Sequence, residues 1–400
     1  MAAYSGDVLI AGAGIGGLTA ALALLRSGHN VQVLEQASQM LEIGAGVQLS
    51  PNCTRVLFEL GVGDQLVARA SEPVRKEIRL WNSGRHWKLF DLGPRCREKY
   101  GFPYLTVHRA HLHAMLLEAV RQLAPQAIVL GAKVSGCQSG EDAATLNTED
   151  GRSFTAMVAV GADGVHSAVR AAMFGDDRPV YSGLMAWRGL IPMASLPLHL
   201  RQATGVNWVG PGSHVIHYPL SEDGLVNFVG AVERDDWKVE SWNERGSVEE
   251  CLNDFQGWHD DVQSLIRSIA TPYKWALMTR EPMACWTRGR LTLLGDACHP
   301  TLPFLAQGAA MAIEDGYLLA RALKEYAGRP EEALARYENV RKDRTSKVVR
   351  GSNENARRFH DRSLASEAGA GEYVDREWTE ARVVERYDWL FRYDATRVDI

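Results

Sequence analysis

The sequence predicts an α/β fold in which a Rossmann-like domain is interrupted by a β-sheet domain and followed by C-terminal helices. Three observations predict it. The chain begins with a strand, glycine turn, helix and strand, its middle alternates apolar and polar residues, and the part beyond residue 310 is charged and mostly helical in pattern. A chain of 400 residues, 46% of them hydrophobic, suits two or three such domains.

The first element is a βαβ unit. An apolar run at residues 8–11 stops at GAGIGG, a helical stretch follows as far as Gly28, and a second apolar run covers 31–35. Each of the three glycines in GxGxxG has a mechanical role. Gly12 allows the tight turn, Gly14 lets a pyrophosphate approach the backbone, and Gly17 lets the helix pack on the strand. The pattern predicts a dinucleotide site.

Glu35 ends the second strand, where an acid accepts hydrogen bonds from a ribose 2′-hydroxyl. A carboxylate there repels a 2′-phosphate, so the site suits FAD or NAD rather than NADP. The alternative, a glycine-rich turn with an unrelated surface Glu, is less favoured because strand, turn, helix and acid occur together.

Two β-rich insertions follow. We expect a discontinuous dinucleotide-binding domain made of residues 1–75, 104–180 and 276–362. A β-rich substrate domain that includes a hairpin is expected at 76–103 and 181–275, and a C-terminal helical tail at 363–400. The stretch SLASEAGAGEY at 363–373 is predicted to be a mobile loop.

Composition limits the partners. A net charge of −5 gives no reason to expect nucleic acid or an acidic membrane surface, and no apolar run approaches the about 20 residues of a membrane helix. The six cysteines contain no CxxC pair, so reduced thiols are expected. The N-terminus does not have the pattern of a signal peptide. We expect a cytoplasmic monomer or homodimer.

Two stretches contain clustered residues of the types that bind metals. HRAHLH at 108–113 holds three His that rarely converge on one ion without a carboxylate or Cys at suitable spacing. GDACHP at 295–300 places Asp296, Cys298 and His299 almost side by side, which leaves metal binding, nucleophilic catalysis or a third role open. Asp296 follows an apolar strand, at the place where open α/β sheets present ligand-binding groups.

Taken in order, GAGIGG with Glu35, HRAHLH, GADGVHS and GDACHP…AQGAAMAIEDG span nearly the whole chain. In this combination the chain resembles the single-component FAD-dependent aromatic hydroxylases, which have the para-hydroxybenzoate hydroxylase fold. Within that family it is most similar to salicylate hydroxylase-like enzymes and 3-hydroxybenzoate 6-hydroxylase. The shared stretches include IGAGVQLSPN at 43–52, AWRG at 186–189 and YDWLFRYD at 387–394.

The resemblance implies FAD as cofactor, NADH or NADPH as co-substrate, and a set of cofactor residues. It places Gly12, Gly14, Gly17 and Glu35 on the AMP half, Arg109 on the phosphate or ribitol, Asp163 in a motif that touches FAD and the pyridine nucleotide, Asp296 on a ribitol hydroxyl, Gln48 near the flavin, and the backbone N–H groups of Gly308 and Ala309 at the flavin pyrimidine edge. Cys298 and His299 are then loop structure rather than a metal or nucleophile site.

The implied reaction hydroxylates a phenolic aromatic carboxylate, of the salicylate or 3-hydroxybenzoate type, through a flavin C4a-hydroperoxide. That oxidant is weak, so the ring must be activated by deprotonating or hydrogen-bonding its phenol, a role suited to His. His214 and Tyr218 are four residues apart, on one face of a strand, while His217 points to the other face. We predict that His214 is the base and Tyr218 orients the substrate; the alternative is a strand His satisfied within the sheet.

Other substrates and chemistries stay open. A hydroxypyridine carboxylate of the 6-hydroxynicotinate type or a bicyclic phenol would suit the same fold, as would FAD-dependent oxidase or dehydrogenase chemistry or a flavin sensor without turnover. Pro303 stands where the resemblance to 3-hydroxybenzoate 6-hydroxylase calls for Gln, which disfavours 3-hydroxybenzoate. No Arg stands out as the partner of a substrate carboxylate.

Overall fold

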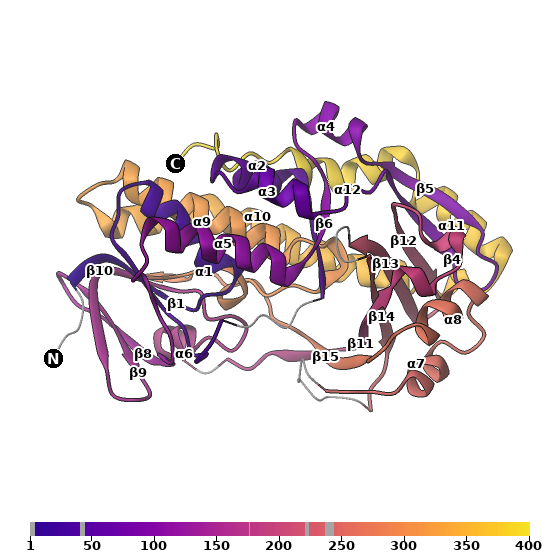
Figure 1. Ribbon diagram of the computed structural model, residues 1–400, viewed down its shortest axis with the longest axis horizontal. Coiled ribbons are helices and arrows are strands. Elements are labelled where there is room, and N and C mark those ends of the chain that lie inside the picture. Colours follow the sequence, from indigo (N-terminus) through magenta and orange to yellow (C-terminus); the bar gives the residue numbers. More distant parts are fainter. Residues whose placement is uncertain (1–4, 41–44, 176, 221–223, 237–243) are drawn as a thin grey trace.

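The computed structural model describes residues 5–40, 45–175, 177–220, 224–236 and 244–400. The start of the IGAGVQLSPN motif, residues 43 and 44, lies outside these ranges. The chain folds around two large sheets at opposite ends of the molecule, with helices running between and beside them (Figure 1).

The first sheet has eight strands and a mainly parallel centre. Its order is β16-β17-β10-β1-β2-β7, with β9 paired to β10 and β8 paired to β9. The parallel pairs β1·β2, β1·β10 and β10·β17 place four strand ends, and the loops that follow them, at one edge. The strands are β1 Ser5–Ala11, β2 Val31–Leu34, β7 Ile128–Val129, β8 Val134–Ser139, β9 Ala144–Thr148, β10 Ser153–Gly161, β16 Thr287–Arg288 and β17 Leu291–Leu293.

The second sheet has seven strands in the order β15-β11-β14-β13-β12-β4-β5 and is antiparallel except for β12·β4. Helices α7 (Val248–Asp254) and α8 (Asp260–Arg267) cover one face, where Trp187 is buried and donates from Nε1 to Asp254. The strands are β4 Arg75–Leu80, β5 His86–Asp91, β11 Val180–Pro192, β12 Thr204–Gly210, β13 Ser213–Leu220, β14 Leu225–Glu233 and β15 Tyr273–Thr279.

A short antiparallel pair connects the two halves. Strands β3 (Gly46–Leu49) and β6 (Leu105–His108) lie against the second sheet, where the Gly46 N–H donates to Asn227 Oδ1 at 2.7 Å and the Thr106 hydroxyl donates to the Pro219 carbonyl at 2.6 Å. At position 46 a Cβ would lie 2.8 Å from the ring of Tyr218, so glycine is needed for this close approach.

Helices complete the molecule. The longest, α10, contacts β16 of the first sheet near its start, and His360 at its end hydrogen-bonds to β13 of the second sheet. It therefore ties the two ends together, as Figure 1 shows. The helices are α1 Ile15–Arg26, α2 Pro51–Glu59, α3 Gly63–Arg69, α4 Pro94–Tyr100, α5 Arg109–Leu123, α6 Ala168–Phe174, α7 Val248–Asp254, α8 Asp260–Arg267, α9 Gly308–Glu325, α10 Pro330–Phe359, α11 Glu367–Glu377 and α12 Glu380–Arg392.

The predicted fold class is confirmed: a Rossmann-like βαβ start, an inserted β-sheet and C-terminal helices are all present. The prediction of a mobile loop at 363–373 is wrong. A 3-10 turn at Arg362–Ala365 and helix α11 occupy this stretch, and Leu364, Ala370 and Tyr373 are buried. Ser366 caps α11 by accepting from the Gly369 N–H, and the small residues that suggested a loop allow close packing.

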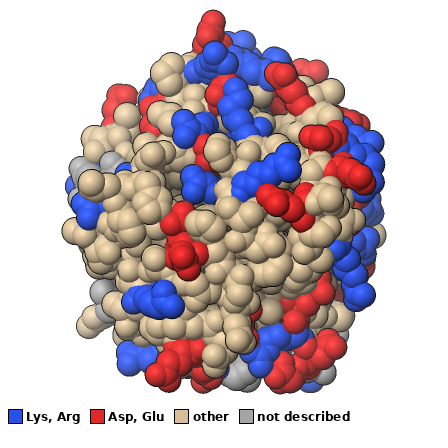
Figure 2. Space-filling view, turned by 90° about the vertical axis from the view of Figure 1, so that its right-hand side faces the viewer, with Lys and Arg blue, Asp and Glu red and all other residues tan. Residues whose placement is uncertain are grey.

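The end of the molecule shown in Figure 2 has no large patch of one charge among its described residues. On the end of the molecule that carries the second sheet, basic and acidic side chains are interspersed (Figure 2). None of the described helices is long and apolar enough to cross a membrane.

Candidate active site

The glycine loop between β1 and α1 has the geometry of a pyrophosphate cradle. Gly12 has φ +97°, and a Cβ at Gly17 would lie 2.0 Å from the Gly12 carbonyl oxygen, so neither position accepts a side chain without a shift. Gly14 differs, because a Cβ there meets nothing within 4 Å. The backbone at the N-terminus of α1 therefore faces open space, where a phosphate could reach its N–H groups.

Two side chains fix this loop through Ala13. Its N–H donates to Glu35 Oε2 at 2.8 Å, and its carbonyl oxygen lies 2.8 Å from His113 Nε2. The other Glu35 oxygen accepts from the Ala37 N–H. Glu35 thus holds the loop and retains acceptor capacity for a ribose hydroxyl. His113 and His108, which caps α5 by accepting from the Ala110 N–H, have structural partners.

Asp296 lies in a recess. Burial raises its pKa, with the Arg109 guanidinium opposing the shift, yet its side chain is exposed. A carboxylate that is surrounded by protein and still accessible lines an internal hollow rather than the outer surface. Arg109, at the start of α5, is close enough to Asp296 to act on its pKa, so the structure brings these two predicted cofactor residues together.

Asp163 has a different orientation. Its carboxylate accepts from the Ser167 hydroxyl and from the Val169 N–H at the start of α6. Burial raises its pKa, opposed first by the Ser167 hydrogen bond. It is the backbone of Ala162 and Asp163 that lies against Gly12, because a Cβ on that glycine would be 2.6 Å from the Ala162 oxygen.

Gly308 and Ala309 open α9, as the sequence predicts, and the loop before them is held tightly. Ala306 has φ +55°, a left-handed conformation that a non-glycine residue adopts only when its surroundings enforce it. The buried Gln307 amide donates to Ser50 Oγ at 2.8 Å and accepts from Asn52 Nδ2 at 3.0 Å. The start of α2 thereby fixes the loop that presents the α9 N-terminus.

A buried charge network, which the sequence alone did not predict, supports the GDACHP loop from behind. Asp315 Oδ2 accepts from the Gly295 N–H at 2.9 Å and from His299 Nε2 at 2.7 Å, and its Oδ1 accepts from Arg341 Nε at 2.6 Å. Glu314 pairs with Arg341 and Arg344.

The pKa values in this network reflect paired charges. Burial opposes the charged form of His299, but neighbouring Cys298 and Asp315 raise the His299 pKa well above its usual value. Burial likewise opposes ionisation of Asp315, but His299 and then Arg341 lower its pKa to about 2. His299 therefore braces the loop, while Cys298 is buried with a raised pKa and is not an available nucleophile.

His214 is fully buried on β13, beside the rings of Phe304 and Phe359. Its Nδ1 lies 2.6 Å from His360 Nε2, and His360 Nδ1 lies 3.2 Å from Glu233 Oε1. When His360 is neutral with its Nδ1 proton directed at Glu233, its Nε2 accepts from His214 Nδ1. His214 Nε2 then remains an acceptor, and it has no hydrogen-bond partner among the described residues.

Tyr218 lies on the same face of β13, since Ile216, Tyr218 and Leu220 form one buried cluster. It hydrogen-bonds with the Gln48 side chain, and burial raises its pKa. Gln48 Oε1 also accepts from Tyr104 Oη at 2.8 Å and from Lys76 Nζ at 3.3 Å. Gln48 thus faces the second sheet, and Tyr104 and Lys76 are two site residues that the sequence did not indicate.

The structure also places two further residues that the sequence analysis discussed, His217 and Pro303. His217 points to the opposite face of β13, where burial and then Arg79 lower its pKa to about 3. Pro303 is exposed at the start of the 3-10 turn Pro303–Leu305. Among the described residues, no three His, Cys, Asp or Glu side chains are grouped to hold a metal ion.

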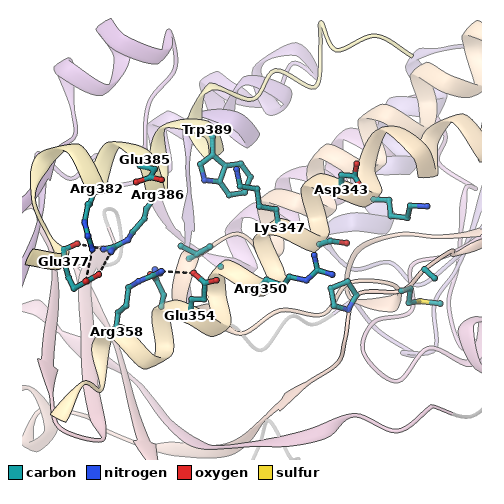
Figure 3. Close-up of a pocket in the computed structure, with 18 residues that line it drawn as sticks. Asp343, Lys347, Arg350, Glu354, Arg358, Glu377, Arg382, Glu385, Arg386 and Trp389 are labelled. Atoms are coloured by element: carbon teal, nitrogen blue, oxygen red, sulfur yellow. Dashed lines mark hydrogen bonds and ion pairs between the residues drawn. The ribbon is translucent and has the colours of Figure 1, made fainter. Parts of the chain in front are cut away.

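A separate groove of about 1120 Å³ runs between α10 and α12. Figure 3 shows its mixed charges, with Arg358 on Glu354 and both Arg382 and Arg386 on Glu377. None of the predicted catalytic or cofactor residues lines it.

Comparison with known proteins identifies the family. The family model described as "FAD binding domain" matches residues 5–352. A 3-amino-4-hydroxybenzoate 2-monooxygenase of Streptomyces platensis is 38% identical over 98% of this chain and 97% of its own. A 3-hydroxybenzoate 6-hydroxylase of Polaromonas naphthalenivorans is 35% identical, covering 97% of this chain and 96% of its own. A solved salicylate hydroxylase substrate complex has a TM-score of 0.80 at 27% identity, over 98% of this chain and 96% of that chain.

The chain belongs to this FAD-binding family, and it is an FAD-dependent aromatic monooxygenase of the kind that uses NAD(P)H. The predicted resemblance and cofactor are thereby confirmed. The described residues fit FAD on their own geometry as well: a cradle open at Gly14, an accessible recessed Asp296 beside Arg109, and a braced α9 N-terminus.

Proposed function

We propose that this protein hydroxylates a phenolic aromatic carboxylate, with His214 accepting the phenol proton and Tyr218 orienting the ring. The observation that carries the proposal is the buried Nε2 of His214, which has no hydrogen-bond partner among the described residues and lies at the end of a chain that runs through His360 to Glu233. Three similar proteins named for hydroxybenzoates, aminohydroxybenzoates or salicylate support this substrate class.

Bound FAD, reduced by NAD(P)H, would supply the oxygenating chemistry with O₂; the protein residues prepare the ring. A phenol hydrogen-bonded to His214 Nε2 gains electron density ortho and para to its oxygen, where attack occurs. Burial and then His360 lower the His214 pKa well below its usual value, so the imidazole is neutral and able to accept at neutral pH.

The His–His–Glu chain can pass this proton outward. When His214 takes a proton on Nε2, it can release the Nδ1 proton to His360, which can release its own to Glu233. Glu233 has an exposed side chain and reaches solvent. The buried faces of Phe304 and Phe359 exclude water from the His214 ring, which limits loss of the oxidant as peroxide.

The cofactor roles follow the same geometry. We infer that Gly12, Gly14, Gly17 and Glu35 bind the AMP half, that Arg109 and Asp296 bind the phosphate and ribitol, and that Gly308 and Ala309 face the flavin pyrimidine edge. Asp163 acts through its loop backbone against Gly12 and by capping α6.

The test uses purified FAD-loaded protein with salicylate, 3-hydroxybenzoate, 3-amino-4-hydroxybenzoate and 6-hydroxynicotinate. At least one is expected to stimulate NAD(P)H oxidation and give a product with one added oxygen. In His214→Asn, hydroxylation should slow about 100-fold or more, with peroxide release rising and FAD retained. His217→Asn, on the opposite face of the same strand, is the matched control. Undiminished coupled turnover in His214→Asn would exclude the assigned role.

A further inference from the structure

The face of the second sheet that carries Tyr218 also carries a buried lysine. Lys76 on β4 is 8% exposed, and strand alternation directs it to the opposite side from its neighbours Arg75 and Glu77. Glu77 is occupied on its own face by Arg75 and Arg79. The nearest acid in sequence is therefore not the partner of Lys76.

Sheet register places Lys76 in line with Tyr218. Gly205 of β12 pairs with Lys76 of β4, and Val206 of β12 pairs with His217 of β13. One step along the antiparallel pair, Gly205 stands opposite Tyr218. Lys76 and Tyr218 thus flank a position without a side chain, two strand spacings or about 10 Å apart at their Cα atoms.

The polar groups between them have more donors than acceptors. Lys76 Nζ and Tyr104 Oη both donate to Gln48 Oε1, at 3.3 and 2.8 Å. An ammonium group has three donors, and this neutral amide oxygen is its one hydrogen-bond acceptor among the described residues. Burial lowers the Lys76 pKa to about 8, as expected where no anion offsets the lost hydration.

We propose that Lys76 binds the carboxylate of the substrate, in a subsite completed by Tyr104, Gln48 and Tyr218. The inference rests on the proposed function and adds to it the direction in which the substrate lies in the site. His214 and Tyr218 are four residues apart on one strand, about 13 Å between their Cα atoms, and their side chains share one face. A hydroxyaryl carboxylate between them would present its phenol to His214 and its carboxylate to Lys76.

Arg188 is the rival cation. It lies on β11, on the same sheet face as Leu190, and is 7% exposed, with its guanidinium over the rings of Tyr273 and Trp275. The aromatic rings favour a packing role for it. Lys76 is favoured as the anchor because it shares hydrogen-bond partners with Tyr218.

The experiment measures binding rather than turnover. Each ligand is titrated into FAD-loaded protein without NAD(P)H, and Kd is read from the change in flavin absorbance. The ligand pairs are 3-hydroxybenzoate with 3-hydroxybenzamide and 6-hydroxynicotinate with 6-hydroxynicotinamide, which differ in the carboxylate charge. The variants are Lys76→Met, Lys76→Arg and Arg188→Met, with Lys88→Met on the adjacent strand as control, since that side chain is 57% exposed.

The wild type should bind each acid more tightly than its amide. Lys76→Met should raise the Kd of the acid about 10- to 100-fold and leave that of the amide unchanged, Lys76→Arg should retain part of the preference, and Lys88→Met should match the wild type. As pH rises through about 8, the wild-type Kd ratio of amide to acid should fall, because Lys76 loses its proton. The amide corrects for titration of the phenol.

Two results would overturn the inference: Lys76→Met retaining the acid preference, or Arg188→Met abolishing it while Lys76→Met does not. The wild-type pH series answers the question even where a variant loses FAD. Failure of the proposed function has a different signature, because no panel compound would then be hydroxylated whatever the Kd values show.

Discussion

Two buried polar regions of this molecule are built in opposite ways. Between α9 and α10, the carboxylates Glu314 and Asp315 meet Arg341, Arg344 and His299, so every charge has an opposite charge beside it. On the second sheet, Lys76 is hydrogen-bonded to a neutral amide and His214 to the imidazole of His360. The charges of the first region therefore balance one another without a ligand, whereas the second region has donor and acceptor capacity left for one.

The charge network between α9 and α10 holds the GDACHP loop in place. Asp315 binds the Gly295 N–H directly, one residue before Asp296, and holds His299 three residues after it. The recessed Asp296 is therefore positioned from both sides by one carboxylate on α9. A paired network of this kind is rigid but depends on each member, since removing one leaves buried charge uncompensated.

The largest effect should come from Asp315→Asn. It leaves His299 without its anion and removes one of the two carboxylates that pair with Arg341, so the free energy of unfolding should fall by about 3–5 kcal/mol, measured by urea titration. Glu354→Gln on α10, which removes an exposed ion pair with Arg358, should cost no more than about 1 kcal/mol. Equal effects of the two variants would show that the buried network has no special role.

The wild-type protein should also lose this stabilisation in acid. The Asp315 pKa is lowered to about 2, so its contribution is present above the unfolded value near 3.8 and is lost as pH falls toward 2.

Lys76 should also make stability rise with pH, but in the alkaline range. Its pKa is lowered to about 8 in the folded protein, so between pH 8 and about 10.5 the unfolded chain binds more protons and stability rises with pH. Relative to Lys76→Met, the wild type should gain up to about 3 kcal/mol across this range. The measurement is urea unfolding of both proteins at pH 7.5 and 10. A constant difference would mean that Lys76 already has an anionic partner.

The same contrast explains what the sequence could predict. Gly12, Gly14, Gly17 and Glu35 lie within one local βαβ unit, so their spacing alone indicates the cradle. The pairing of His214 with His360 joins residues 146 positions apart, where the end of α10 meets β13, and no local pattern reports it. Lys76 sits between Arg75 and Glu77 and resembles a surface residue until strand register places it beside Gln48. The small residues of 363–373 suggested a loop because their tertiary packing was not visible.

Two glycine variants separate cofactor binding from folding in the first region. Gly14→Ala places its Cβ in open space, so the stability of the apoprotein should change by less than about 0.5 kcal/mol, while FAD affinity falls about tenfold. Gly17→Ala meets the Gly12 carbonyl and should destabilise the apoprotein itself by about 1–3 kcal/mol. FAD titration and urea unfolding of both variants test this. Unchanged FAD affinity in Gly14→Ala would place the pyrophosphate elsewhere.

The smallest effect, and the sharpest for the second region, is expected from Gly205→Ala. The added Cβ lies 3.8 Å from Lys76 Cγ, an ordinary contact, and a strand interior favours Ala over Gly by about 0.5–1 kcal/mol, so unfolding should become slightly harder. The same methyl group occupies the space between Lys76 and Tyr218, so the Kd for a hydroxyaryl carboxylate should rise. Gain of stability with loss of affinity is the mark of a position kept empty for a ligand. If both improved together, the space beside Lys76 would be packing alone.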